Sequence, residues 1–159
     1  MANAIHAVEA SGVGRWMRES LWAYPSVEIV HIAGLGLLFG SIVVVDLRLL
    51  GLGRSVPITK LVAHAVPWSL GGFALALCSG LLMFSAHASD FLDNRVFLLK
   101  MALILAGGVN AAWLHTGPFT RAAAWDTGVA PPSAVRAAGA LSIVMWIGVI
   151  ACGRLLAYT

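Results

Sequence analysis

The stretch EIVHIAGLGLLFGSIVVVDLRLLG, residues 28–51, decides the fold. Most of it is Leu, Ile, Val and Gly, which is the composition of a helix surrounded by lipid. At 1.5 Å rise per residue, about 20 such residues span a hydrocarbon core that is about 30 Å thick. The same stretch carries Glu28 and His31 near its start and Asp46 and Arg48 near its end. Ionisable side chains are costly inside a membrane, so these four need a physical reason.

The composition of the whole chain agrees with a membrane protein. The chain has 159 residues, of which 60% are hydrophobic and 11% charged, and its mean hydropathy is +0.89. Soluble domains carry about 25% charged residues. The ten Lys and Arg residues form no basic run, so a nucleic-acid partner is not expected. Cys78 and Cys152 lie in apolar runs, which favours simple packing over a disulfide framework.

Four apolar segments of about 20 residues or more recur along the chain. Backbone amides inside lipid must find partners within their own segment, so each segment is expected to be a helix. The connecting stretches contain Pro, Gly, Asp and Asn, which are turn formers. We therefore predict an all-α fold, a single up-and-down four-helix transmembrane bundle over residues 26–159. The expected helices cover 27–50, 62–84, 96–115 and 136–157.

The first 25 residues have a different composition. Residues 13–25, VGRWMRESLWAYP, mix charges with aromatic side chains and stop at Pro25. This pattern predicts a short helix at the membrane surface, with its aromatic rings at headgroup level. A frayed tail is the plainer alternative. Lys and Arg divide evenly between the two ends of the bundle, and the compact basic connector at 46–61 favours an N-terminus outside.

The expected topology brings Glu28, His31 and Lys100 to one layer of the bundle, near its N-terminal end. The plainer interpretation is that Lys100 extends to the headgroups and that Glu28 only neutralises it. A neutral imidazole more than a turn inside the apolar run needs a hydrogen-bond partner or a ligand. His31 is therefore the strongest candidate for function, and we expect Glu28 and His31 to face the bundle interior with partners on the third helix.

The opposite layer holds His115, His64, Asp46 and Arg48. His115 ends the third helix and is either a ligand or an interfacial residue. Asp46 and Arg48 are expected to be interfacial anchors. Gly36 and Gly40 form a GxxxG pattern, which predicts a close helix contact on that face.

Histidines on neighbouring membrane helices can bind haem b through a neutral imidazole. His31 is the first candidate ligand, with Glu28 and Lys100 beside a propionate or paired with each other, and His115 is a second candidate. The sequence shows no CxxCH, no zinc-type Cys/His cluster, no phosphate-binding Gly motif and no catalytic triad. Room for a porphyrin would have to come from small residues, namely Gly34, Gly71, Gly72, Gly107 and Gly108.

Several stretches together resemble a family of small bacterial four-helix membrane proteins of unknown function. They are the segment at residues 18–52, VPWSLGGFALALCSGLLMF at 66–84, FLLKMALILAGGVNAAWLH at 97–115, AAAWD at 122–126 and GALSIVMWIGVIACGRLLAY at 139–158. The resemblance covers nearly the whole chain. It implies an integral protein of the bacterial cytoplasmic membrane and implies no activity.

A more distant resemblance involves His31, Arg48 seventeen residues later, and Lys100 at the start of the third helix. These positions are similar to the HemJ-type membrane protoporphyrinogen oxidases. That resemblance implies a haem b cofactor and covers two of the four helices.

The leading functional prediction is a haem-b-binding or redox-associated membrane protein that uses His31. One alternative is an accessory subunit of a membrane complex, which packs a partner through its GxxxG face. Another is a small transporter or proton relay through Glu28, His31 and Lys100. The expected partners are the lipid bilayer and a second copy or another membrane protein, and enzymatic activity stays an open question.

Overall fold

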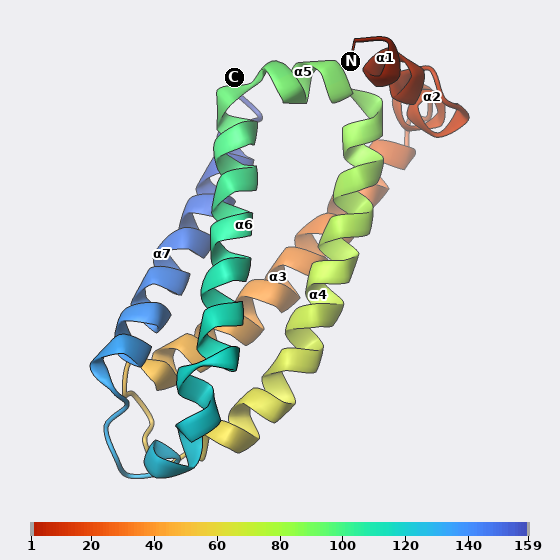
Figure 1. Cartoon of the computed structure of the whole chain (residues 1–159). Coiled ribbons are helices and arrows are strands. Elements are labelled where there is room, and N and C mark those ends of the chain that lie inside the picture. The colour runs from red at the N-terminus through yellow and green to blue at the C-terminus, as the bar shows by residue number, and fades with distance from the viewer. Residues whose placement is uncertain (1, 159) are drawn as a thin grey trace. The chain divides into compact units, whose positions relative to one another are not determined.

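The computed structural model describes residues 2–158, with side chains from Ile5 to Tyr158. The elements follow the chain as α1 (Ala2–Glu9), α2 (Gly12–Glu19), α3 (Ala23–Leu49), α4 (Ile58–Ala86), α5 (Ala88–Asp93), α6 (Arg95–Thr116), the 3-10 helix η1 (Pro118–Trp125) and α7 (Ser133–Leu155) (Figure 1). No strand occurs in this part of the chain. The predicted all-α class is confirmed.

Four of these helices, α3, α4, α6 and α7, are long and apolar enough to cross a membrane, counted over residues 2–158. They contain 27, 29, 22 and 23 residues. Even the shortest extends about 33 Å, which exceeds the hydrocarbon thickness of about 30 Å. The chain is therefore built as a multi-pass integral membrane protein.

The spanning helices start earlier than the sequence suggested. Helix α3 begins at Ala23, so Pro25 lies in its first turn and does not separate it from the preceding segment. Proline is tolerated there because the first amides of a helix have no intrahelical acceptor. Helix α4 begins at Ile58, four residues before its expected start, and contains Pro67.

The chain divides into two compact units, and α3 and α4 contribute to both. The first unit comprises the residues up to Leu38 together with Leu70–Arg95. It contains α1, α2, the first part of α3, the second part of α4, and α5. The second unit comprises Phe39–Ser69 and the residues from Val96 onward, with α6, η1 and α7.

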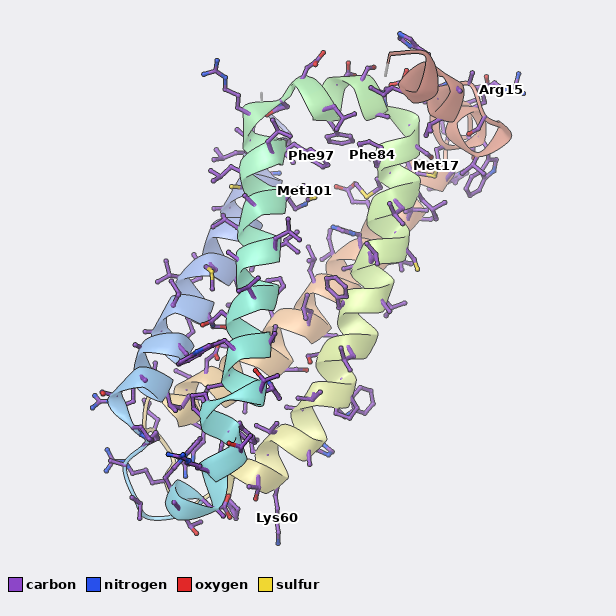
Figure 2. The ribbon with its side chains drawn as sticks, in the orientation of Figure 1. Arg15, Met17, Lys60, Phe84, Phe97 and Met101 are labelled. Atoms are coloured by element: carbon purple, nitrogen blue, oxygen red, sulfur yellow. The ribbon has the colours of Figure 1, made fainter. Side chains whose placement is uncertain are left out.

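In the first unit, α2 is attached to the end of α4. Met17 is only 1% exposed and packs in a small core with Ala23 and Ala86. Figure 2 shows Met17 on the side of α2 next to the end of α4 and Arg15 on the outer side. Arg18 donates from Nη1 to the carbonyl of Ala86 at 2.8 Å. The N-terminal segment is thus two docked short helices, which excludes the frayed-tail alternative.

Also in the first unit, α3 and α4 cross at two glycines. A Cβ on Gly34 would lie 2.8 Å from the backbone N of Ala76, and one on Gly72 would lie 2.5 Å from the backbone N of Leu38. Only glycine permits this approach. Gly36 and Gly40 take no part in this crossing, because a Cβ on either would meet nothing within 4 Å among the described residues.

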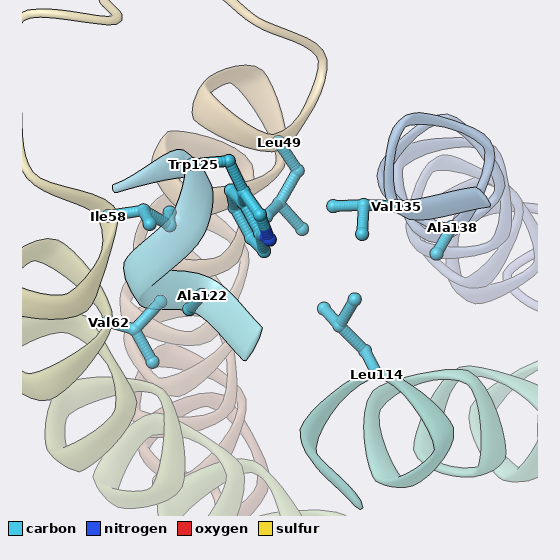
Figure 3. Close-up of a cluster of buried hydrophobic side chains, with 8 residues drawn as sticks. All are labelled: Leu49, Ile58, Val62, Leu114, Ala122, Trp125, Val135 and Ala138. Atoms are coloured by element: carbon cyan, nitrogen blue, oxygen red, sulfur yellow. The ribbon is translucent and has the colours of Figure 1, made fainter. Parts of the chain in front are cut away.

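The second unit has the larger apolar core. In Figure 3, Trp125 of η1 and Leu49 lie at its centre, between two groups of smaller side chains. One group belongs to α4 and η1 and the other to α6 and α7. This core covers the end of the unit where α3 stops and α4 and α7 begin. Its other members are Ile58, Val62, Leu114, Ala122, Val135 and Ala138.

Helices α6 and α7 run side by side in the second unit (Figure 1). Gly148 of α7 lies against Leu103, and Gly107 of α6 lies against the ring of Trp146. Near the other end, the side-chain amide of Asn110 donates to the carbonyl of Ala138 at 3.1 Å. Polar side chains in this unit thus bond to backbone groups of neighbouring helices.

Candidate functional site

His31 lies on the α3 part of the first unit and bonds to α4. Its Nδ1 is 3.0 Å from the hydroxyl oxygen of Ser79, which is 3% exposed. That hydroxyl donates its single proton to the carbonyl of Leu75 at 2.6 Å. With its own proton on the Leu75 carbonyl, Ser79 accepts from His31, and this arrangement corresponds to an imidazole with its proton on Nδ1. The partner of His31 shown here lies on α4 and not on the third long helix.

This tautomer has a chemical consequence. A neutral imidazole with its proton on Nδ1 carries its lone pair on Nε2. A hydrogen bond from the other ring nitrogen fixes the orientation of a metal-ligating histidine and raises its basicity. The His31–Ser79 pair thus has the hydrogen bond that orients an Nε2 ligand. Gly80 lies beside the ring, since a Cβ there would be 3.3 Å from Cε1 of His31.

The glycines expected to make room for a porphyrin have other positions. The space beside Gly34 and Gly72 is occupied by backbone atoms at the α3–α4 crossing, and Gly107 faces the Trp146 ring. A Cβ on Gly71 or Gly108 would meet nothing within 4 Å among the described residues. Helix contacts thus use three of these five glycines.

Glu28 and Lys100 belong to different units. Glu28 is an exposed residue of the first unit, so its expected interior orientation was wrong. Lys100 lies in the second unit and is partly buried against α7. Its Nζ lies 3.7 Å from the position of a Cβ on Gly153, and it interacts with the thiol of Cys152, which is 5% exposed.

His115 ends α6 in the second unit and is exposed. Its Nδ1 is 2.9 Å from the carbonyl of Ala111, one turn earlier. Its ring stacks on Phe119 of η1 with 5.6 Å between ring centroids. These contacts are those of a helix-terminal residue, as the plainer interpretation expected.

Arg48 and Asp46 are buried, which contradicts the expectation of interfacial anchors. Arg48 is 3% and Asp46 is 5% exposed. Arg48 donates from Nε to the carbonyl of Val56 at 2.9 Å and from Nη2 to the carbonyl of Asp126 at 2.7 Å. It therefore ties the α3–α4 loop to the end of η1. Sequence reasoning missed this because both acceptors are backbone groups of loops.

Asp126 fixes the same loops from the other side. Its Oδ1 accepts from the backbone N–H and from the hydroxyl of Thr59, both at 2.9 Å. These bonds hold the pKa of Asp126 below its usual value, with a smaller contribution from the Arg48 charge. Asp126 thus acts as a cap on the start of α4.

The first unit also contains a polar hollow that the sequence did not indicate. Its volume is about 440 Å³, and Glu9 and Arg18 lie in its wall. Glu9 accepts from the backbone N–H and hydroxyl of Ser89 at 2.8 and 2.6 Å, and these bonds lower its pKa. His6 and His87 also line the hollow. His6 lies within 4 Å of the Glu9 carboxylate, and His87 lies within 4 Å of the Asp90 carboxylate. Over the described residues, no group of three or more His, Cys, Asp or Glu side chains is placed to hold a metal ion.

Comparison with known proteins identifies the chain at the level of a family. A family model described as "Family of unknown function (DUF6644)" matches residues 11–159. The chain belongs to this family. The DUF6644 region includes α2, all four spanning-length helices, and both His31 and Ser79. No curated protein and no solved structure matches the chain.

Proposed function

We propose that this DUF6644 protein binds haem b in the membrane, with Nε2 of His31 as an axial ligand. The observation that carries the proposal is the bond from His31 Nδ1 to the Ser79 hydroxyl, which is itself bound to Leu75. A buried serine with this geometry selects the tautomer that ligates iron through Nε2.

Haem b would supply one-electron transfer within the membrane. The chain's own residues have two roles in this proposal. His31 provides the nitrogen lone pair, and Ser79 holds the imidazole in place and keeps its proton on Nδ1. Both residues belong to the first unit, so the proposal rests on a site within that unit.

Haem titration of the purified protein in detergent tests the proposal. Wild-type protein is expected to bind one haem, and His31→Ala to lose that binding. Ser79→Ala is expected to weaken affinity by about 10- to 100-fold, the usual effect of removing the group that orients a metal-ligating histidine. His64→Ala is the matched control, because His64 is an exposed histidine of α4. Equal haem affinity in all four proteins would refute the assignment.

A second candidate function, an accessory subunit, is favoured by one observation. The Gly36–Gly40 face of α3 has no described atom within 4 Å of either Cβ position. Small residues at this spacing permit close contact with another membrane helix. An accessory subunit is expected to purify colourless, and substitution of both glycines by Leu should release its partner. A haem protein should keep its colour after the same substitutions.

A further inference from the structure

The second unit contains a buried carboxyl group that no part of the proposed haem site uses. Asp46 lies three residues before the end of α3 and is 5% exposed. Helix α7 packs directly on it, since a Cβ on Gly139 would lie 3.2 Å from the Asp46 carbonyl. One turn along α7, the hydroxyl of Ser142, which is 8% exposed, interacts with the Asp46 carboxyl.

One oxygen of this carboxyl group lacks a partner. Oδ2 of Asp46 is fully buried and has no hydrogen bond from any residue between 2 and 158. The contrast with Asp126 is direct, because a single oxygen of Asp126 accepts two hydrogen bonds. An ionised carboxylate buried with an unsatisfied oxygen is strongly unfavourable, whereas a neutral acid or a carboxylate with a bound cation is tolerated.

The charged groups around Asp46 do not neutralise it. Arg48, on the same helix, directs Nε and Nη2 to loop carbonyls, its Nη1 is also buried without a hydrogen-bond partner, and no ion pair shorter than 4.0 Å joins it to Asp46. On α7, Arg136 is exposed to the surroundings. The polar neighbour on α7 is the neutral Ser142. Among the described residues, no cationic side chain thus forms an ion pair with Asp46.

We propose that Asp46 is a proton-binding site of the membrane domain, and that its carboxyl group is the neutral acid when α3 and α7 are packed. The proton is taken from hydronium, which leaves water, and bonds to one carboxyl oxygen; release transfers it back to water and forms hydronium. Because α3 ends at Leu49, the exchange takes place at the end of the helix that leads into the 50–57 loop. The site is separate from His31, which belongs to the other unit.

The neutral acid explains the packing at this position. A carboxylic acid has about the shape and hydrogen-bonding capacity of a primary amide, so Asp46→Asn should leave the α3–α7 contact intact. A negative charge between these helices would have to be solvated, which the close approach of Gly139 opposes. Loss of the proton is therefore expected to loosen the contact between α3 and α7.

Infrared spectroscopy of the purified full-length protein tests the proposal. Between about pH 5 and about pH 8 an ordinary aspartate, with a pKa of about 4, is ionised. We expect wild-type protein to show the carbonyl band of a protonated carboxylic acid in this range, with a shift in D₂O. Asp46→Asn should lose the band. Asp93→Asn, at an exposed aspartate of α5, should keep it.

A second variant keeps the test decisive if Asp46→Asn fails to fold. Ser142→Ala removes the hydroxyl that interacts with the carboxyl group, so the acid band should remain and move to higher frequency. An unmoved band, or one that persists in Asp46→Asn, would overturn the assignment. A wild-type spectrum without the band would also overturn it. If sodium or potassium ions then stabilise the wild-type protein and not the Asp46→Asn protein, Asp46 holds a cation.

Discussion

Adding one methyl group at the α3–α4 crossing should separate these two helices, and adding it one residue away should not. Gly72→Ala is the perturbation. Its Cβ would lie 2.5 Å from the backbone N of Leu38, 2.8 Å from the carbonyl of Gly34 and 3.0 Å from the Leu38 Cα. All three are backbone atoms, so no rotation of a side chain can relieve the overlap. The two helices have to move apart.

The magnitude follows from two opposing effects. Alanine is favoured over glycine inside a helix by about 1 kcal/mol. Overpacking a close contact costs about 1–3 kcal/mol, and more where backbone has to shift. Gly72→Ala is therefore expected to destabilise the protein by up to about 2 kcal/mol overall, and by more where the backbone has to shift. Gly71→Ala, where the new Cβ meets nothing within 4 Å, should be neutral or stabilising by up to about 1 kcal/mol.

The assay is denaturant or thermal unfolding of both variants in the same detergent, followed by circular dichroism and by gel filtration of the unheated protein. A second pair, Gly34→Ala against Gly36→Ala, applies the same reasoning to α3. If Gly72→Ala is as stable as Gly71→Ala, the helices do not cross at Gly72 and the account of the first unit is wrong.

Arg48→Ala should lower the free energy of unfolding by about 3 kcal/mol, because it removes two charge-assisted hydrogen bonds to loop carbonyls. Arg54→Ala, at an exposed loop arginine, should change it little. Equal effects of the two substitutions in chemical denaturation would contradict this prediction. The lowered pKa of Asp126 means that its stabilising contribution is present above its unfolded value of about 4 and is lost as the pH falls through the lower folded value. Melting temperature should therefore fall less on acidification in Thr59→Val than in wild-type protein, and an identical fall would count against the Thr59–Asp126 bonds. Met17→Ala should cost about 2–5 kcal/mol of local packing and release α2, which limited proteolysis will detect as faster cleavage near residue 20.

The class of fold could be predicted from the sequence because one physical constraint dominates it. Apolar runs longer than the bilayer core have to be helices, whatever their neighbours are. The prediction therefore identified all four spanning helices. It misplaced the start of α3, because Pro25 was interpreted as a stop although proline also fits the first turn of a helix.

Which side chains meet could not be predicted in the same way. Gly36 and Gly40 have the spacing of a contact motif, yet α3 is rotated so that Gly34 faces α4. Rotation of a helix about its axis depends on the shape of its partner, and Gly72 on α4 supplies that shape. The burial of Arg48 likewise depends on two loop carbonyls, one of them 78 residues further along the chain.

The sequence singled out His31 as the first candidate residue, and it did not indicate that Ser79 is its hydrogen-bond partner. His31 stood out because an imidazole inside an apolar helix needs a partner. Ser79 did not stand out, since a serine in a membrane helix usually bonds to its own backbone, and Ser79 also does so. Only the pairing of α3 with α4 brings its hydroxyl to the imidazole.

The most direct test of the central claim is a dithionite-reduced minus oxidised visible spectrum of wild-type, His31→Ala and His64→Ala protein, each expressed with ample haem and purified in detergent. We predict a sharp b-type α-band in wild-type and His64→Ala protein and its loss in His31→Ala protein that remains folded. A flat wild-type spectrum at good purity, or an unchanged band in His31→Ala, would contradict the account.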